Sequence, residues 1–510
     1  MERFVSRHTG NITGIIECFD RVVFKGYLPI SSASSMEAFL YHRRMLLKDF
    51  KGFVLQQSEK LREHARRLAE KTGRPVIHLS GPQRKEDKVR EIAARDGVTD
   101  GLVCILTAVE ATQSFRMVPG EGRPRLLNAG RKCLCLYFYY LDREFGLMHI
   151  RLPTWFPFPI QVCLNGHDWL DRKLTRNGIA HHKADNAFLR IDNPARAQRL
   201  ADRFTDINWP RILSALARRV NPLMTDLLEG MNYYWVVDQA EFSTDIMFAD
   251  GNTLKDLYPE LVNHAILCFT AEDVLTFLGR KLHGRFEGEI IGDSKKRHWG
   301  RRVKHRMKNN WIKMYDKNKC VLRIETVINH PYEFKVRRRG IRKGQEVTGW
   351  FPMAKGVANM YRYREVSLAA NHRYLDALAE VNNPSKAREN LQSLAQPLHK
   401  QERSFRGFNP MLKEDFLLFA AVMRGEHAIM GFRNKDLRQH LFSPPKDDSI
   451  ARRQSSRISS LLARLHVRGL IAKIPHSRRW RVTRIGSSLM SMVLKLHREQ
   501  YPDYLMKLAS

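Results

Sequence analysis

The sequence has 510 residues, of which 43% are hydrophobic and 10% aromatic, a composition that excludes a largely disordered chain. Lys and Arg total 87 against 53 Asp and Glu, which gives a formal net charge of +34. A field of this size attracts polyanions, so nucleic acid is the first expected partner. An anionic membrane surface is the weaker candidate, because the chain has no long apolar span and no basic amphipathic tail.

Seven cysteines are spread along the chain, and none has the paired spacing of a zinc site. We expect them to be small buried hydrophobic residues in a reducing compartment. The first residues lack the apolar core of a secretory signal, so the sequence predicts a cytoplasmic protein. An arginine-rich composition without functional meaning is the alternative reading of the charge, but here the charge is clustered.

Residues 1–165 are expected to form a mixed α/β domain. Strand patterns at residues 12–28, 76–79 and 102–106 alternate with helical patterns at residues 36–50, 58–71 and 85–96. Residues 133–141 and 145–152 flank a short polar turn, as in a β-hairpin. Strands that alternate with helices predict one sheet covered by helices.

Asp20 lies between apolar neighbours in the first of these strands. Metal-dependent nucleases of the RNase H type place an acidic ligand in a central strand, so Asp20 is a candidate catalytic residue. The alternative is an ion pair with Arg21 or Lys25 at a strand edge.

Residues 166–350 are expected to hold a helical insert, from 167 to 232, and then a basic strand region. Alternation along the strand at 233–248 would place Asp238 on one face and Glu241 and Asp245 on the other. Carboxylates gathered in a basic protein are suited to a divalent ion such as Mg²⁺. We therefore consider Asp238 and Asp245 as catalytic candidates, and salt-bridge acceptors as the alternative.

The densest charge lies at residues 295–343, where eighteen Lys or Arg face only three acidic residues. Strand patterns at 311–315 and 320–328 around a turn predict a β-hairpin with basic side chains on one face, which suits a phosphate backbone. An edge hairpin protected by lysines is the alternative. The expected nucleic-acid contacts are Lys304, Arg306, Lys308, Lys313, Lys317, Arg337, Arg338 and Arg339.

The segment from Tyr315 to Glu325 resembles phage and plasmid rolling-circle replication initiators, through Tyr-Asp-Lys followed by Leu-Arg-Ile-Glu. The resemblance implies a nickase with Tyr315 as nucleophile and Glu325 near a metal. The His-hydrophobic-His triplet of that family is absent. Pairing of Glu325 with Arg323 or a cross-strand lysine is the alternative.

Residues 351–409 are expected to form a helix and a linker. Residues 410–510 then show three helical patterns followed by two short strands, and this stretch resembles the winged-helix domains of bacterial transcriptional regulators, especially at 461–471 and 479–483. The resemblance implies a third helix in the major groove and a wing on the backbone. The residues it assigns to nucleic acid are Arg453, Ser456, Arg457, Ser460, Arg478, Arg479 and Arg481.

The sequence thus predicts an α+β (mixed α/β) protein with a helix-covered sheet, a basic β-hairpin and a C-terminal winged helix-turn-helix domain. Its expected function is to bind DNA or structured RNA, with a bacterial mobile element or plasmid as the expected setting. A nuclease, nickase or recombinase that uses Mg²⁺ with Asp20, Asp238, Asp245 and Glu325 is one alternative, and a replication initiator belongs to the same class. A winged-helix regulator is the other. No further cofactor is expected.

Overall fold

The computed structural model describes residues 1–81, 84–120, 124–280, 290–297, 300–342, 344–379, 381, 391–400, 403–427, 431–445, 447–475 and 477–497. It divides into two compact units. Unit 1 contains Met1–Ile12, Phe248–Ile324 and Ala369–Ser510, and unit 2 contains Thr13–Met247 and Glu325–Leu368. Each unit therefore draws on segments far apart in the chain, a coarser division than the four consecutive segments expected from the sequence.

Unit 2 is built around a large mixed sheet. Its strands follow the order β13-β9-β1-β6-β5-β4-β3-β2, where β13 (Val321–Ile328) passes from unit 1 into unit 2. The pair β2–β3 is parallel, whereas the pairs from β3 to β6 and the pair β6–β1 are antiparallel. The other strands are β1 (Ile12–Tyr27), β2 (Val76–His78), β3 (Gly101–Val118), β4 (Arg125–Asp142), β5 (Gly146–Pro153), β6 (Ile160–Asn165) and β9 (Tyr234–Phe248).

Helices and two separate hairpins complete unit 2. The hairpins are β7 (His181–Ala184) with β8 (Ala187–Ile191), and β14 (Lys335–Arg342) with β15 (Gln345–Pro352). The helices are α2 (Ala33–His42), α3 (Phe50–Thr72), α4 (Lys85–Arg95), α5 (Gly166–Arg176), α6 (Pro194–Asp202) and α7 (Trp209–Val220). The mixed α+β class predicted from the sequence is confirmed. The β7–β8 hairpin lies where the sequence predicted only helices.

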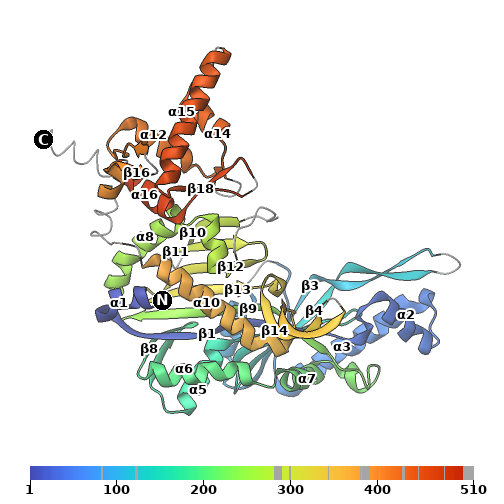
Figure 1. Ribbon diagram of the computed structural model, residues 1–510. Helices are drawn as coiled ribbons and strands as arrows, with labels where there is room; N and C mark the ends of the chain where they lie inside the picture. The colour runs from blue at the N-terminus through green and yellow to red at the C-terminus, as the bar shows by residue number, and fades with distance from the viewer. Residues whose placement is uncertain are drawn as a thin grey trace. The chain divides into compact units, whose positions relative to one another are not determined.

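The helices α5 and α6 lie side by side (Figure 1). Aromatic rings hold α5, α7 and the 3-10 turn Arg203–Asp206 against β1. The ring of Phe19 lies 5.1 Å from that of Phe204, and Phe204 in turn lies 5.1 Å from Trp169 of α5 and 4.9 Å from Trp209 of α7. These side chains are almost fully buried. Because large aromatic rings bury extensive apolar surface, this cluster fixes the position of α5 relative to β1.

Unit 1 begins with α1 (Glu2–Arg7). Its sheet strands lie side by side in the order β10-β11-β12-β13. The pairs β10–β11 and β11–β12 are antiparallel. The helix α10 passes from unit 2 into unit 1. The elements of this part are α8 (Gly251–Leu267), α9 (Ala271–Phe277), β10 (Ile290–Arg297), β11 (Gly300–Met307), β12 (Asn310–Lys317) and α10 (Met360–Leu378).

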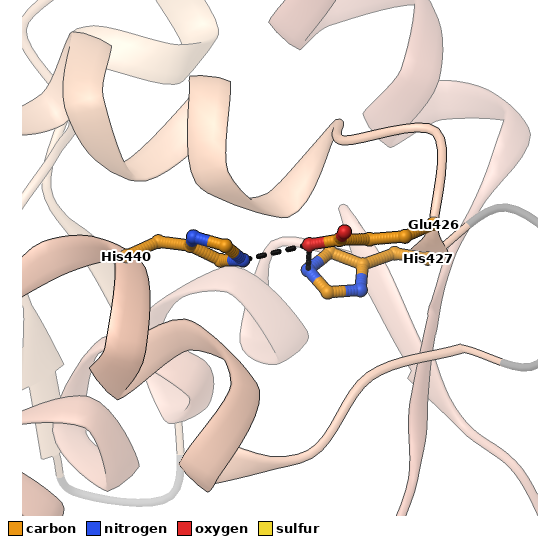
Figure 2. A group of neighbouring side chains, drawn as sticks. All are labelled: Glu426, His427 and His440. Carbon is orange, nitrogen blue, oxygen red and sulfur yellow. Dashed lines mark hydrogen bonds and ion pairs between the residues drawn. The ribbon is translucent and has the colours of Figure 1, made fainter.

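The C-terminal part of unit 1 has its own hydrophobic core, which runs from Leu394 to Val493. Among the described residues of this part, α12, α14 and α15 precede the two-stranded hairpin, in the order expected from the sequence, and α16 follows. Glu426 and His427, which follow α12, lie beside His440 of α14 (Figure 2). The elements are β16 (Leu398–Lys400), β17 (Arg403–Phe405), α12 (Lys413–Val422), α14 (Asn434–Leu441), α15 (Asp448–Val467), β18 (Ile471–Lys473), β19 (Trp480–Val482) and α16 (Arg484–Lys495).

Candidate metal centre

Three buried carboxylates converge in unit 2. Asp20 of β1, Glu241 of β9 and Glu325 of β13 each place one oxygen within 4.8 Å of the other two. Their strands are consecutive in the sheet, in the order β13-β9-β1. Because neighbouring strands run about 4.8 Å apart, one side chain from each can reach the same point. The residues are 5%, 7% and 1% exposed, so the carboxylates are largely shielded from bulk water.

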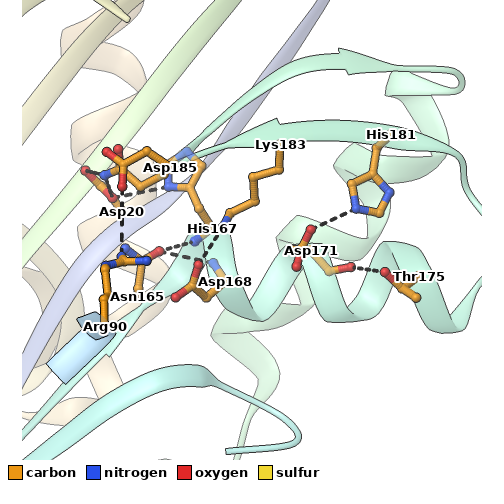
Figure 3. A network of polar contacts seen from close by, with 11 residues as sticks. Asp20, Arg90, Asn165, His167, Asp168, Asp171, Thr175, His181, Lys183 and Asp185 are labelled. Carbon is orange, nitrogen blue, oxygen red and sulfur yellow. Dashed lines mark hydrogen bonds and ion pairs between the residues drawn. The ribbon is translucent and has the colours of Figure 1, made fainter. Parts of the chain in front are cut away.

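A buried histidine holds Asp20 in place. His167 Nδ1 lies 3.2 Å from Asp20 Oδ1 (Figure 3). Nε2 of the same ring lies 3.3 Å from Asp245 Oδ2. The amide of Asn186 also donates to Asp20 Oδ1 at 3.0 Å. These two neighbours restrict the orientation of the Asp20 carboxylate, as the neighbours of metal ligands usually do.

The local sequence explains why His167 reaches Asp20. Strand β6 ends at Asn165, which pairs in register with Arg21 of β1. The Asn165 side chain accepts hydrogen bonds from the backbone N–H groups of His167 and Asp168 and so caps α5. At Gly166 a Cβ would stand 2.0 Å from the carbonyl oxygen of Phe19, so only glycine lets α5 begin this close to β1.

The hairpin β7–β8 is tied to α5 by polar contacts. Lys183 Nζ lies 2.7 Å from Asp168 Oδ1, and His181 Nε2 lies 2.9 Å from Asp171 Oδ1 (Figure 3). Asn186 is in the turn of this hairpin. Lys183, close to the turn, therefore holds the turn near α5, where Asn186 reaches Asp20, whereas His181 lies at the open end of the hairpin.

Glu241 links the carboxylates to an adjoining cavity. Its Oε1 accepts hydrogen bonds from Arg21 Nη2 at 2.9 Å and Gln239 Nε2 at 2.7 Å, and both donors line the cavity. Burial lowers the pKa of Arg21, but the nearby anionic groups, chiefly the Glu241 carboxylate, together raise this pKa overall, so the guanidinium stays charged.

The cavity has a volume of about 900 Å³ and lies within unit 2. Its wall is polar and includes a network in which Glu110 accepts hydrogen bonds from Tyr137 and Lys85. Arg151 donates to the same carboxylate at 3.1 Å. The lining residues are Arg21, Val23, Lys25, Glu110, Ala111, Thr112, Gln113, Asn128, Ala129, Gly130, Tyr137, His149, Arg151, Pro159, Gln161, Cys163, Asp238 and Gln239.

The structure brings together some of the predicted catalytic residues and separates others. Asp20 and Glu325 belong to the carboxylate cluster, and Asp245 is one contact away through His167. Asp238 lines the cavity but is 3.0 Å from Lys355 Nζ, outside the cluster. Tyr315 is a buried residue of β12 in unit 1 and is no member of the cluster.

Sequence reasoning missed two residues of the site. Glu241 was expected on the strand face opposite Asp238 but was not among the candidate site residues. His167 gave no signal of its own. The only local hint was the capping asparagine and glycine at the end of a strand pattern, which indicate a tight strand-to-helix turn.

The exposed basic hairpin is β14–β15 in unit 2. Arg337, Arg338 and Arg339 are all exposed on β14. Trp350, the register partner of Arg337, is 51% exposed. Exposed arginines beside an exposed aromatic ring offer contacts to phosphates and to bases.

The hairpin predicted at residues 311–328 corresponds to β12 and β13, and its expected exposed basic face is wrong for β13. Every residue of β13 is buried, including Arg323, because strands flank it on both sides. Of the other nucleic-acid contacts predicted in this region, Arg306 of β11 is exposed and the lysines are less so. Lys304 lies 4.1 Å from the centre of the Trp311 ring, and Lys308, Lys313 and Lys317 are partly buried.

On the C-terminal elements the predicted contacts fall into two groups. Arg453, Ser456, Arg457, Ser460 and Arg478 are exposed. Two others are engaged within unit 1: Arg479 Nη1 donates to the Gly431 carbonyl at 3.1 Å, and Arg481 forms an ion pair with Glu272. These two side chains hold the hairpin in place.

Comparisons with known proteins give no family. No protein-family model matches the chain, and no curated protein matches it. One solved structure is weakly similar, described as the di-domain ARO/CYC BexL from the BE-7585A biosynthetic pathway. It is 11% identical, with a TM-score of 0.15, and the match covers 58% of this chain and 94% of the other. In the part of the chain that the structure describes, no helix has the length and apolar character to span a membrane.

Proposed function

We propose that this protein binds nucleic acid and cleaves its phosphodiester backbone with a divalent ion held by Asp20, Glu241 and Glu325. The convergence of these three carboxylates from neighbouring strands carries the proposal. Carboxylate oxygens are the ligands preferred by Mg²⁺ and Mn²⁺. The net charge of +34 supports a polyanionic substrate.

The ion would polarise a phosphate oxygen and lower the pKa of a bound water. In hydrolysis the water oxygen bonds to phosphorus, the bridging P–O bond breaks, and a proton passes to the leaving oxygen. His167 and Asp245 keep Asp20 oriented toward the ion. Arg21, at the boundary of the cluster and the cavity, would neutralise a phosphate there.

We further propose that the C-terminal helices and hairpin form a winged-helix domain that provides a second contact. The support is the order of elements, α12, α14, α15 and then β18–β19, together with the exposed Arg453, Ser456, Arg457 and Ser460 on α15. These residues recur at three- and four-residue spacing, which keeps them on one side of the helix. Two contacts on one chain raise affinity through effective concentration.

The decisive experiment is a cleavage assay with labelled single-stranded and duplex DNA and RNA, in Mg²⁺, in Mn²⁺ and in EDTA. We expect cleavage that requires the ion and falls more than about a hundredfold in Asp20→Asn, Glu241→Gln and Glu325→Gln, because each change removes an anionic ligand. Asp238→Asn is the matched control, since Asp238 lines the cavity outside the cluster. It should keep most of the activity.

Cleavage that survives all three amide substitutions would overturn the proposal of metal-dependent chemistry. A protein that binds nucleic acid and leaves it intact in every ion is the second candidate function, favoured by the exposed basic residues of α15 and β14. Gel-shift measurements on the same variants distinguish the two, because loss of cleavage with unchanged binding assigns the carboxylates to chemistry.

A further inference from the structure

A second group of metal-binding side chains lies in unit 1, far along the chain from the carboxylates. Glu426 and His427 follow α12, and His440 is in the last turn of α14. One donor atom from each lies within 4.8 Å of the other two. Glu426 Oε1 is 2.7 Å from His440 Nε2 and 4.0 Å from His427 Nε2 (Figure 2).

His427 is the unusual member of this group. The residue is only 7% exposed, and its Nε2 has no hydrogen-bond partner among the described residues. The 4.0 Å separation from Glu426 is too long for a hydrogen bond, yet the nitrogen faces that carboxylate. A buried ring nitrogen without a partner costs free energy unless a ligand satisfies it. Burial also lowers the pKa of His427, which favours the neutral ring that binds metals.

We propose that Glu426, His427 and His440 bind a transition-metal ion of the Zn²⁺ class. Two imidazole nitrogens and one carboxylate oxygen form a known donor set for Zn²⁺, with a fourth position open to water or another ligand. Nitrogen donors favour Zn²⁺ over Mg²⁺, which separates this site from the carboxylate cluster of unit 2.

The observed distances are close to what such an ion requires. Bonds of about 2.0–2.1 Å in a tetrahedron place donor atoms roughly 3.3 Å apart. The measured 2.7 Å and 4.0 Å lie on either side of this value, and each differs from it by less than about 1 Å. Arg424 Nε lies 3.0 Å from Glu426 Oε1, the same oxygen from which both histidine distances are measured.

A bound ion would join the segment after α12 to α14. Leu437 of α14 is fully buried in the same hydrophobic core as Ile458 and Leu462 of α15. An ion at this site would therefore hold the segment after α12 to α14, beside this hydrophobic core. This inference does not depend on the proposed nucleic-acid cleavage.

The test uses the full-length chain without a histidine tag, with Mg²⁺ in excess to occupy the carboxylate cluster. Zn²⁺ is titrated in competition with a chromophoric chelator, and Co²⁺ binding is followed by visible absorption. We expect the parent to bind one more ion than His427→Ala or His440→Ala, and that ion to give the spectrum of tetrahedral Co²⁺. Glu426→Gln should weaken Zn²⁺ binding by more than about tenfold.

His399→Ala is the matched control, because His399 is an exposed histidine of β16 in the same unit. This variant should bind Zn²⁺ like the parent. Circular dichroism checks that each variant is folded, and Glu426→Gln changes only an exposed side chain. Equal stoichiometry and equal Co²⁺ spectra in the parent and in all three site variants would overturn the proposal.

Discussion

Asp20 is held by its neighbours more firmly than an ordinary salt-bridge acceptor. The His167 ring lies between Asp20 and Asp245, and it is fully buried. His167→Phe keeps the ring volume but removes both polar contacts from buried carboxylates. We expect this variant to lose about 3 kcal/mol of unfolding free energy, measured in urea, and to bind Mn²⁺ more weakly.

His181→Phe is the matched control for that prediction. His181 of β7 contacts Asp171, which is on α5, the helix that also carries His167. Asp171 lies outside the carboxylate cluster and is partly exposed to water. We expect a smaller loss of stability and unchanged Mn²⁺ affinity. A variant of His167 that binds Mn²⁺ like the parent would show that the histidine does not position Asp20 for an ion.

His305 provides a prediction about pH. The residue is 3% exposed, and its Nε2 lies 3.1 Å from the hydroxyl oxygen of Tyr374. Burial lowers the pKa of the ring from 6.5 to about 4 in the folded protein. Between pH 6.5 and about 4 the unfolded chain therefore binds more protons than the folded chain. The stability that is present above pH 6.5 is lost as the pH falls toward 4.

The expected loss is on the order of 3 kcal/mol at the acidic end of the window. The measurement is urea unfolding at several pH values between about 7 and 5 for the parent and for His305→Phe. The variant keeps the aromatic packing and cannot bind a proton, so its stability should fall less steeply. Identical pH dependences in the two proteins would contradict this assignment.

At the scale of elements, the contact between α5 and β1 depends on Gly166. A methyl group there would stand 2.0 Å from the Phe19 carbonyl oxygen and 2.7 Å from its carbonyl carbon. Gly166→Ala therefore forces α5 away from β1, and with it His167 away from Asp20. We expect a loss of about 1–3 kcal/mol in urea unfolding and weaker Mn²⁺ binding.

The same substitution in α3 gives the control. Gly52 is exposed within the helix, and a Cβ there would contact nothing within 4 Å. Because alanine favours helix more than glycine does, Gly52→Ala should stabilise the protein by up to about 1 kcal/mol. The unfolding free energy should therefore fall in Gly166→Ala and rise in Gly52→Ala. Equal effects would mean that α5 adapts to the extra methyl group.

Many elements could be predicted because their patterns are local. The strand expected at residues 233–248 is β9, and the helices expected at 36–50 and 58–71 are α2 and α3 with shifted ends. The hairpin β7–β8 was missed, because β7 is only His-His-Lys-Ala and β8 has only five residues, so neither strand carries a long alternating apolar pattern. The burial of β13 also escaped prediction, since it depends on strands that flank it in space.

At the scale of the whole molecule, the carboxylate cluster shows what one sequence cannot supply. Asp20 is a candidate because of its place in an apolar strand, and Glu325 because of the resemblance to replication initiators, and the two were joined only in the general hypothesis of a Mg²⁺-dependent nuclease. Their meeting point with Glu241 depends on the order β13-β9-β1. This order brings together Asp20 and Glu241, which are 221 residues apart in the chain, and Glu325, which follows Glu241 by 84 residues. Residue type and local pattern carry no information about such an order.

The net charge gives a prediction about nucleic-acid affinity. Replacing Arg337, Arg338 and Arg339 of β14 together with glutamine should weaken binding and reduce the slope of log affinity against log salt by up to about 3. Electrophoretic mobility shifts at several salt concentrations measure both quantities. The change removes exposed cations and leaves the buried sheet intact.

A charge-matched control lies on α3, where Arg62, Arg66 and Arg67 contact the acidic side chains of Glu59 and Glu63. Three glutamines at these positions remove the same formal charge. Because local acids already offset these arginines, the salt slope should change much less. Equal changes in the two triple variants would attribute binding to net charge alone and not to the β14–β15 hairpin.

Binding of Mn²⁺ to the full-length protein, followed by electron paramagnetic resonance with Zn²⁺ present to fill the histidine site, tests the carboxylate centre most directly. The parent should bind Mn²⁺ at a site that is lost in Asp20→Asn and in Glu325→Gln and kept in Asp238→Asn, because only the first two remove cluster ligands. Identical Mn²⁺ binding by the parent and all three variants would contradict a metal centre at these strands.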